Sequence, residues 1–269
     1  MSQNLKSVQE YFDEAGPTDV SRLFADWTAL VDRLAARVHE RFELTRDPST
    51  LELESFSAEN GPSGSVRGYT GPEIDWMIHS HMQNAAAGFV NVHLTIWAGP
   101  HIDVPHFGMA LGAFPQGWVF LDTIPRKNLL TDMDYFDKYY EPYNAEWEQV
   151  AFQNDWIDPF ISRSALVRAS LSPNAHCFRA PSEDRMTALS TELAERALDR
   201  WLGWVEEATP VPVEERAALA EADLLIRKNI AERDPANDMG DRFFGREMTE
   251  KLVRALWGGD RELPRPLES

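Results

Sequence analysis

The chain has 269 residues, 43% of them hydrophobic and 26% charged, so it is long enough to bury a full core and too apolar for wholesale disorder. Its 44 acidic residues against 26 basic ones give a net charge of −18, which disfavours nucleic acid and anionic membranes as general partners. The single cysteine, Cys177, allows no intramolecular disulfide. With a polar segment 1–14 that shows no secretory pattern and no apolar run of about 18 residues, the sequence predicts a cytoplasmic protein without a membrane span.

The first third of the chain is predicted to contain one long helix. Apolar residues recur every three or four positions, which predicts an amphipathic helix over residues 18–42 with Thr18 as its N-cap: Leu23, Trp27, Leu30, Leu34 and Val38. The following stretch, residues 45–71, is rich in Pro, Ser, Gly and Asn and predicts at most one short strand through Leu51, Leu53 and Phe56.

The middle of the chain changes to the pattern of strands. Apolar runs of strand length occupy residues 74–82, 89–97 and 118–122, and their short connections suit an antiparallel meander. A partly helical segment is expected over residues 135–153, interrupted at Pro142, and another strand over residues 164–170.

Helices close the chain. They are predicted from Ser182 through Trp204, from about residue 213 to 232, and from residue 246 to 257, where Gly258 and Gly259 end the last one. The order of elements predicts an α+β fold, a three-layer α/β/α sandwich whose central antiparallel sheet is flanked by helices. We expect one domain over residues 1–269, with an N-terminal helix region (1–44), a mainly sheet region (45–180) and C-terminal helices (181–258).

Polar residues concentrate in the first two predicted strands. Strand alternation puts Asp75, His79 and His81 on one face of the first strand, and it puts Asn91, His93, Thr95 and Trp97 on one face of the second. A solvent-facing side of an antiparallel sheet would explain this pattern. The absence of Lys and Arg from both strands favours instead a site that titrates near neutrality.

The segment after these strands, residues 101–108, offers two further interpretations. His101 and Asp103, completed by His176, could begin a two-His-one-carboxylate iron(II) site of an oxygenase. Alternatively, Asp103 is an acid aimed by the rigid Val104-Pro105 turn, able to donate a proton or to accept hydrogen bonds from a ligand.

Several motifs occur in an order that resembles a known family. They are Gly71-Pro72-Glu73-Ile74-Asp75-Trp76, His79-Ser80-His81, Ile102-Asp103-Val104-Pro105-His106-Phe107, the segment 164–173 ending in Ser172-Pro173, and Asp223, Arg227, Asp234 and Arg242-Phe243-Phe244-Gly245-Arg246-Glu247 toward the C-terminus. Over roughly residues 70–257 the sequence is similar to red chlorophyll catabolite reductase and its relatives, the ferredoxin-dependent bilin reductases. The resemblance implies an α/β/α sandwich that holds an open-chain tetrapyrrole between the sheet and the C-terminal helices.

The resemblance also implies a reaction. Members use no bound flavin, metal or nicotinamide; reduced ferredoxin supplies single electrons to the bilin and protein acids supply protons. Asp103 and Asp234 match the family's two acids, and His79 and His81 are both candidates for a strand imidazole that relays protons. Aromatic and imidazole side chains near the bilin would be His93, Trp97, His106 and Phe107.

Two bilin propionates require cations. The candidates are Arg168 first, then Arg163, Arg179 and Arg227. The family's acid a few residues after Asp-x-Pro is missing here, where Met109-Ala110-Leu111-Gly112 stands, and no plastid transit segment is readable. Biliverdin, or another product of haem opening, is therefore expected as substrate rather than red chlorophyll catabolite.

The expected protein is a monomer or homodimer that binds ferredoxin, and the alternative to a reductase is a bilin carrier without catalytic activity. Ferredoxins are themselves acidic, so a chain of charge −18 needs a local basic surface to bind one. Arg126-Lys127, Arg163, Arg168 and Arg179 lie in or beside the sheet region, which predicts a charge-asymmetric molecule.

Overall fold

The structure is a computed structural model that describes residues 19–57, 61–114 and 116–262. Its strands are β1 (Thr45–Arg46), β2 (Phe56–Ser57), β3 (Ser63–Thr70), β4 (Ile74–Asn84), β5 (Phe89–Ala98), β6 (His106–Ala113), β7 (Gly117–Ile124), β8 (Asp158–Pro159) and β9 (His176–Ala180). Its helices are α2 (Ser21–Arg41), α3 (Met133–Tyr139), α4 (Asn144–Gln153), α5 (Ala165–Ser170), α6 (Asp184–Glu206), α7 (Val213–Glu232), α8 (Asn237–Phe244) and α9 (Arg246–Trp257), with 3-10 turns η1 (Pro48–Leu53), η2 (Ala85–Ala87) and η3 (Glu141–Tyr143).

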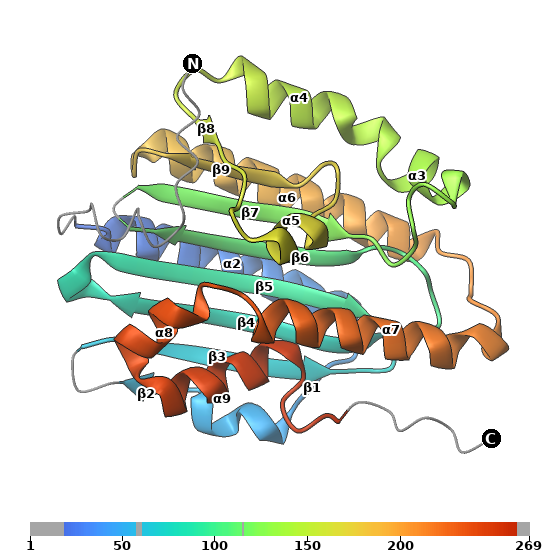
Figure 1. Ribbon diagram of the computed structural model, residues 1–269, viewed down its shortest axis with the longest axis horizontal. Coiled ribbons are helices and arrows are strands. Elements are labelled where there is room, and N and C mark those ends of the chain that lie inside the picture. The colour runs from blue at the N-terminus through green and yellow to red at the C-terminus, as the bar shows by residue number, and fades with distance from the viewer. Residues whose placement is uncertain (1–18, 58–60, 115, 263–269) are drawn as a thin grey trace.

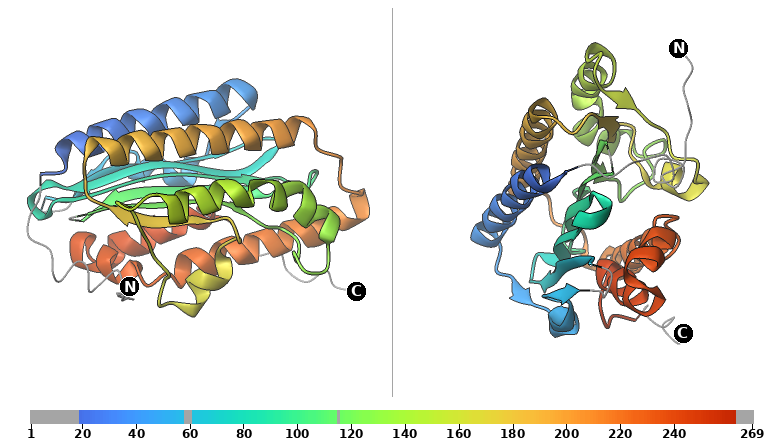
Figure 2. Two further views of the ribbon diagram at one scale, coloured as in Figure 1. Left: turned by 90° about the horizontal axis from the view of Figure 1, so that it is seen from above. Right: turned by 90° about the vertical axis from the view of Figure 1, so that its left-hand side faces the viewer.

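The described strands form one antiparallel sheet in the order β1-β3-β4-β5-β6-β7-β9-β8, with β2 also paired to β3 (Figure 1). Helices α2 and α6 cover one face, while α5 and α7–α9 lie on the other (Figure 2). The predicted α/β/α sandwich is confirmed. None of the helices in the described part of the chain is long and apolar enough to cross a membrane.

Helix α2 buries the predicted stripe, so the period of three and four residues is confirmed. The predicted N-cap, Thr18, lies outside the described residues, and the Ser21 N–H is bound by Asp19 Oδ1 at 3.0 Å. The buried Trp27 Nε1 donates to Ser190 Oγ at 2.9 Å, which joins α2 to α6 above the sheet. The strands at 74–82, 89–97 and 118–122 and the three C-terminal helices also form as predicted. Pro142 interrupts the helical segment as expected, at η3.

The strand predicted over residues 164–170 is wrong: this segment is helix α5. Ser164 caps it, since its Oγ accepts the N–H of Val167 at 3.4 Å. The short apolar run Ala165-Leu166-Val167 fits a strand and a single helical turn equally, and the cap decides between them.

The short strand predicted through Leu51 and Leu53 is also wrong. Pro48 starts a 3-10 turn there, and Asp47 Oδ1 accepts the N–H of Ser49 at 3.0 Å, so only Phe56–Ser57 is extended. The glycine-rich stretch that follows is strand β3 instead. A Cβ at Gly68 would lie 2.7 Å from the Trp76 ring, so glycine is needed for the neighbouring strand to pack there.

Among the described strands and α-helices, β1, β6, β8, β9 and α8 also have no counterpart among the predicted ones. Small residues on one side of β6 break the apolar pattern, namely Gly108, Ala110 and Gly112. Strand β9 has only five residues, and Gly245 ends α8 after eight, so both are too short for periodicity to reveal.

The register between β4 and β5 corrects the expectation of a single polar face. Ser80 pairs with His93 and His81 with Val92, and directly paired residues of an antiparallel sheet point to the same side. His79 and His81 therefore lie on the face covered by α2, with Val92 and Leu94. His93 and Trp97 lie on the opposite face. The two polar patterns belong to opposite sides of the sheet.

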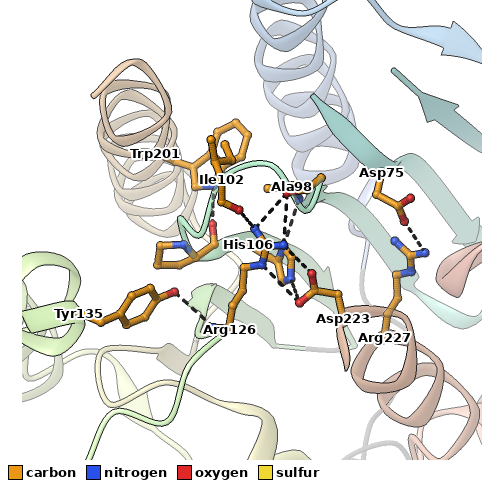
Figure 3. A network of polar contacts seen from close by, with 11 residues as sticks. Asp75, Ala98, Ile102, His106, Arg126, Tyr135, Trp201, Asp223 and Arg227 are labelled. Atoms are coloured by element: carbon orange, nitrogen blue, oxygen red, sulfur yellow. Dashed lines mark hydrogen bonds and ion pairs between the residues drawn. The ribbon is translucent and has the colours of Figure 1, made fainter. Parts of the chain in front are cut away.

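A buried polar network fixes the connection between β5 and β6 to helix α7 (Figure 3). His106 Nδ1 accepts the Ala98 N–H at 3.1 Å, so Nε2 carries the ring proton and donates to Asp223 Oδ1 at 3.0 Å. Arg126 Nη2 contacts Asp223 Oδ2 at 2.6 Å, and the same guanidinium donates to the carbonyls of Gly99 and Ile102. Because both ions are buried, the network holds only while every member is present.

Replacing Asp223 with alanine is therefore expected to lower the free energy of unfolding by about 3–5 kcal/mol, because Arg126 is left buried without its counterion. Asp184→Ala is the control: its carboxylate is 78% exposed in an ion pair with Arg22, so the loss should stay within about 1 kcal/mol. Urea unfolding of the two variants measures both values. Equal losses would show that the network does not anchor α7.

Three histidines predict how stability depends on pH. Burial lowers the pKa of His79, His93 and His106 to about 4, so all three are neutral in the folded protein. Below the ordinary pKa of about 6.5 the unfolded chain binds a proton at each, so stability is lost as pH falls from about 6.5 toward 4. Each histidine contributes a slope of up to about 1.4 kcal/mol per pH unit. Urea midpoints at pH 7.5, 6 and 5 measure the slope, which His93→Gln should reduce by about one proton. A flat profile would contradict the neutral histidines.

Candidate functional site

One face of the four central strands remains accessible to solvent in the middle of the molecule. On β5, β6, β7 and β9 the residues that point toward α2 and α6 are mostly buried, whereas several of the alternate residues that point away are partly accessible. We call these accessible residues the open face: His93, Thr95, Gly108, Ala110, Trp118, Phe120, Asp122, Cys177 and Arg179. Helices α5 and α7–α8 stand beside it rather than over all of it (Figure 2).

The floor of the open face is built from small side chains. Gly108 and Ala110 occupy successive positions of β6, and Ala110 pairs with His93 on one side and Phe120 on the other. A Cβ at Gly112 would lie 2.1 Å from Trp118 Cζ2, so the Trp118 ring covers the end of this floor. The small residues leave room for a flat ligand between aromatic borders.

Ionisable groups of the open face are surrounded by protein although they keep some solvent access. Burial lowers the pKa of His93 to about 4, raises the pKa of the Cys177 thiol, and raises the pKa of Asp122. Protein surrounds each of these groups, so its charged form loses hydration.

His93 belongs to the open face and pairs with Ala110 of β6. Its Nδ1 lies 3.3 Å from Ser80 Oγ, the neighbour across β4 and β5. With its low pKa the ring is neutral at pH 7, so it can accept one hydrogen bond and donate another. A neutral imidazole suits a ligand that carries N–H groups.

Asp122 is held in place from the segment after α5. Its Oδ2 accepts the N–H of Ser172 at 2.9 Å, the Ser172 hydroxyl binds Oδ1, and the Thr123 N–H reaches Oδ1 at 2.8 Å. This carboxyl therefore anchors the Ser172-Pro173 turn beside the open face.

Asp234 lies in the turn between α7 and α8, on the same side of the sheet as His93. Its Oδ1 accepts the Ala236 N–H at 2.9 Å, and burial raises the pKa of its carboxyl. A raised pKa keeps a carboxyl protonated to higher pH, which is what a proton donor needs.

The structure separates Asp103 from Asp234. Asp103 Oδ2 pairs with Lys127 Nζ at 2.7 Å in the β5–β6 connection, where the His101 carbonyl binds the Val211 N–H just before α7. Asp234 follows the other end of α7, whose 20 residues span about 30 Å. The two predicted acids do not face one another.

His79 and His81 lie on the covered face. His79 Nε2 is 2.9 Å from Asp32 Oδ1 on α2, and the His81 ring contacts Phe24 with 6.0 Å between ring centroids. The sheet itself stands between this pair and His93.

The iron-site interpretation finds no matching geometry. Asp103 is paired with Lys127, and His176 Nε2 lies 3.8 Å from Glu146 Oε1 on α4. Within residues 19–57, 61–114 and 116–262, no group of three His, Cys, Asp or Glu side chains is arranged to hold a metal ion.

The remaining candidates lie in four places. Phe107 is core, packed 6.4 Å from the Trp201 ring between centroids, and His106 belongs to the network beside Trp97. Arg179 and Arg227 lie on the side of the open face, paired with Asp158 at 2.6 Å and Asp75 at 2.8 Å. Arg163 and Arg168 are exposed in and before α5.

Sequence reasoning missed Asp122, Arg126 and Asp223 as parts of the site and its support. Asp223 stands in a motif of the resemblance, and Asp122 ends a predicted strand, but neither spacing nor residue type shows which partner each one binds. Those partners, Ser172, His106 and Arg126, come from distant parts of the chain.

Comparisons with known proteins identify the family of this chain and agree with its fold. The family model of red chlorophyll catabolite reductase matches residues 27–257. Red chlorophyll catabolite reductase 1 of Oryza sativa subsp. japonica is 26% identical over 226 residues, covering 78% of this chain and 68% of the relative. Phycoerythrobilin:ferredoxin oxidoreductase of Gloeobacter violaceus is 30% identical over 192 residues, covering 69% of this chain and 74% of the relative.

A solved structure shares the fold. Phytochromobilin synthase from tomato, in complex with biliverdin, superposes with a TM-score of 0.75 at 15% identity, over 89% of this chain and 85% of that one. The match of the family model to most of the chain decides membership, and this protein belongs to the red chlorophyll catabolite reductase family, within the ferredoxin-dependent bilin reductase superfamily.

Proposed function

We propose that this protein reduces an open-chain tetrapyrrole of the biliverdin type with single electrons from reduced ferredoxin. The observation that carries the proposal is the open face, where small residues of β6 adjoin a neutral imidazole, together with a carboxyl of raised pKa on the same side of the sheet. The family and its named relatives, which include a ferredoxin oxidoreductase of a bilin, support the same reaction.

Reduction of the bilin requires electrons and protons in equal number. Reducing one carbon–carbon double bond takes two electrons, from two reduced ferredoxins, and two protons. In our proposal Asp234 donates one proton and solvent water at the open face supplies the second, while His93 accepts a hydrogen bond from a pyrrole N–H and holds the ring on the floor. Asp122 positions the Ser172 turn and does not itself transfer a proton.

Positions 108 and 110 bear on the substrate class. A side chain added at Gly112 would meet Trp118, so an acid after Asp-x-Pro could reach the open face at positions 108 and 110, which are glycine and alanine here. The ionisable group across from Ala110 in the register is His93. This floor carries an imidazole without a facing carboxyl, which supports a biliverdin-type substrate over red chlorophyll catabolite.

Propionate groups would bind Arg227 and Arg179. Within the described structure, Arg227 Nε and Nη1 are buried without a hydrogen-bond partner, and Nη2 lies 2.8 Å from Asp75 Oδ2. A substrate carboxylate would supply the missing acceptor.

A bilin titration tests the proposal directly. Biliverdin added to the protein at micromolar concentration should shift and sharpen its absorbance, and reduced ferredoxin under anaerobic conditions should then convert it to a product that separates by chromatography. Absence of binding would contradict the proposal. Binding without turnover would identify the alternative, a bilin carrier.

The two acids can be separated by mutation. Asp234→Asn should keep biliverdin affinity and lose about 100- to 10,000-fold in kcat, because a positioned proton donor is removed. Asp103→Asn is the matched control and should stay within a few-fold of the wild type, since its carboxylate pairs with Lys127 at the other end of α7. Single-turnover absorbance measures both. A loss confined to Asp103→Asn would reverse the assignment.

A further inference from the structure

Acidic residues are missing from one surface segment of a strongly acidic chain. The protein has 44 acidic residues among 269, yet none occurs between residues 159 and 182. The same segment contains Arg163, Arg168 and Arg179. A second long run without acids, residues 76–102, has no Lys or Arg and forms mostly sheet interior. Residues 159–182, which we call the acid-free segment, therefore have a local excess of positive charge, although Arg179 pairs with Asp158 just outside the segment.

The acid-free segment borders the open face. The Phe160 ring packs on Phe120 with 5.0 Å between centroids, and Ser172 binds Asp122, so the segment is tied to β7 at two points. Helix α5 lies between these ties, in front of β6 and β7 (Figure 1). Phe120 is paired with Ala110, whose other neighbour is His93. Two aromatic rings thus connect the segment to the floor of the proposed site.

The outer surface of this segment combines an apolar residue with cations. Ile161 is 54% exposed, and Arg163, Arg168 and the two alanines Ala165 and Ala169 are exposed around it. The Arg168 guanidinium donates to the Ser162 carbonyl at 2.7 Å, which holds it on the segment. An exposed apolar residue with cations around it is the pattern of a surface that binds an anionic protein.

On the opposite side of the molecule, arginines of α2 lie beside acids of α6. Arg22, Arg33 and Arg37 pair with Asp184 at 3.1 Å, Glu195 at 3.0 Å, and Asp199. Each of these three positive charges therefore has a carboxylate next to it.

We propose that Ile161, Arg163 and Arg168 form the docking surface for the acidic iron–sulfur protein that delivers electrons. This inference rests on the proposed function, because it assumes a one-electron protein donor. The surface is beside the open face, and Phe160 and Phe120 fill the space between the docked donor and the substrate. Residues Arg163 and Arg168 therefore act on the donor and not on the substrate propionates.

The test reverses charge at the two positions. Arg163→Glu combined with Arg168→Glu should lower kcat/KM for reduced ferredoxin by about 10- to 1,000-fold at low salt, which is the range of electrostatic steering. The wild-type rate should fall as salt is added, and the rate of the variant should not. Biliverdin affinity and turnover with reduced methyl viologen, a small donor that needs no docking surface, should equal those of the wild type.

The matched control reverses two exposed arginines of α2, Arg22→Glu with Arg33→Glu, and should keep kcat/KM for ferredoxin. Unchanged ferredoxin kinetics in the α5 variant, or an equal loss in the α2 variant, would overturn the docking surface. A loss of biliverdin affinity or of viologen-driven turnover in the α5 variant would also overturn it and assign the arginines to the substrate. A wild-type protein that turns over with viologen and not with ferredoxin overturns the docking surface alone; one that turns over with neither donor overturns the proposed function as well.

Discussion

The alternation of side chains across one antiparallel sheet, combined with the register of β4 against β5, determines what this protein presents to a ligand. Because Ser80 pairs with His93 and His81 with Val92, the two histidine-bearing strands send their imidazoles to opposite sides. A shift of β4 by one residue would put His79 and His81 on the open face, on the same side as His93. The large apolar residues Val92, Leu94, Met109 and Leu111 hold this register, because they point toward α2 and α6 and are buried there.

A second constraint positions what stands beside the sheet. Asp223 is shared by His106 and Arg126, and Arg126 reaches the carbonyls of the β5–β6 connection. One carboxylate on α7 therefore joins a strand, a loop and a helix that are about 100 residues apart in sequence. The same helix carries Arg227 over Trp97 and ends just before Asp234, so anchoring its middle also sets the two ends of the proposed site. The cost of burying these charges is consistent with a role in orientation rather than in net stability.

Much of the fold could be predicted from the sequence, because long periodic segments carry their own signal. Helix α2 and the strands at 74–82 and 89–97 are examples, and the layered architecture follows from their order. Short elements could not be predicted. Helix α5 depends on a serine cap. Strand β6 has glycine and alanine at alternate positions, which belong to the open face, so it lacks the apolar run that would reveal a strand.

The candidate site was predicted less well than the fold, for a physical reason. Parity within a strand follows from sequence, but the register between strands does not, so His79, His81 and His93 could not be sorted by face. The motif around Asp103 can be recognised in the sequence, whereas its ion pair with Lys127 and its distance from Asp234 along α7 are seen only in the structure. Partners such as Ser172 for Asp122 are 50 residues away and have no sequence signature.

The most direct measurement of the central claim is the biliverdin affinity of two variants that differ in the face they alter. Ala110→Phe fills the floor of the open face, and His81→Phe changes the covered face next to Phe24. With folding verified by circular dichroism, absorbance titration should show that Ala110→Phe loses biliverdin binding while His81→Phe binds like the wild type. Undiminished binding by Ala110→Phe, or its loss in His81→Phe, would contradict the assignment of the site to the open face.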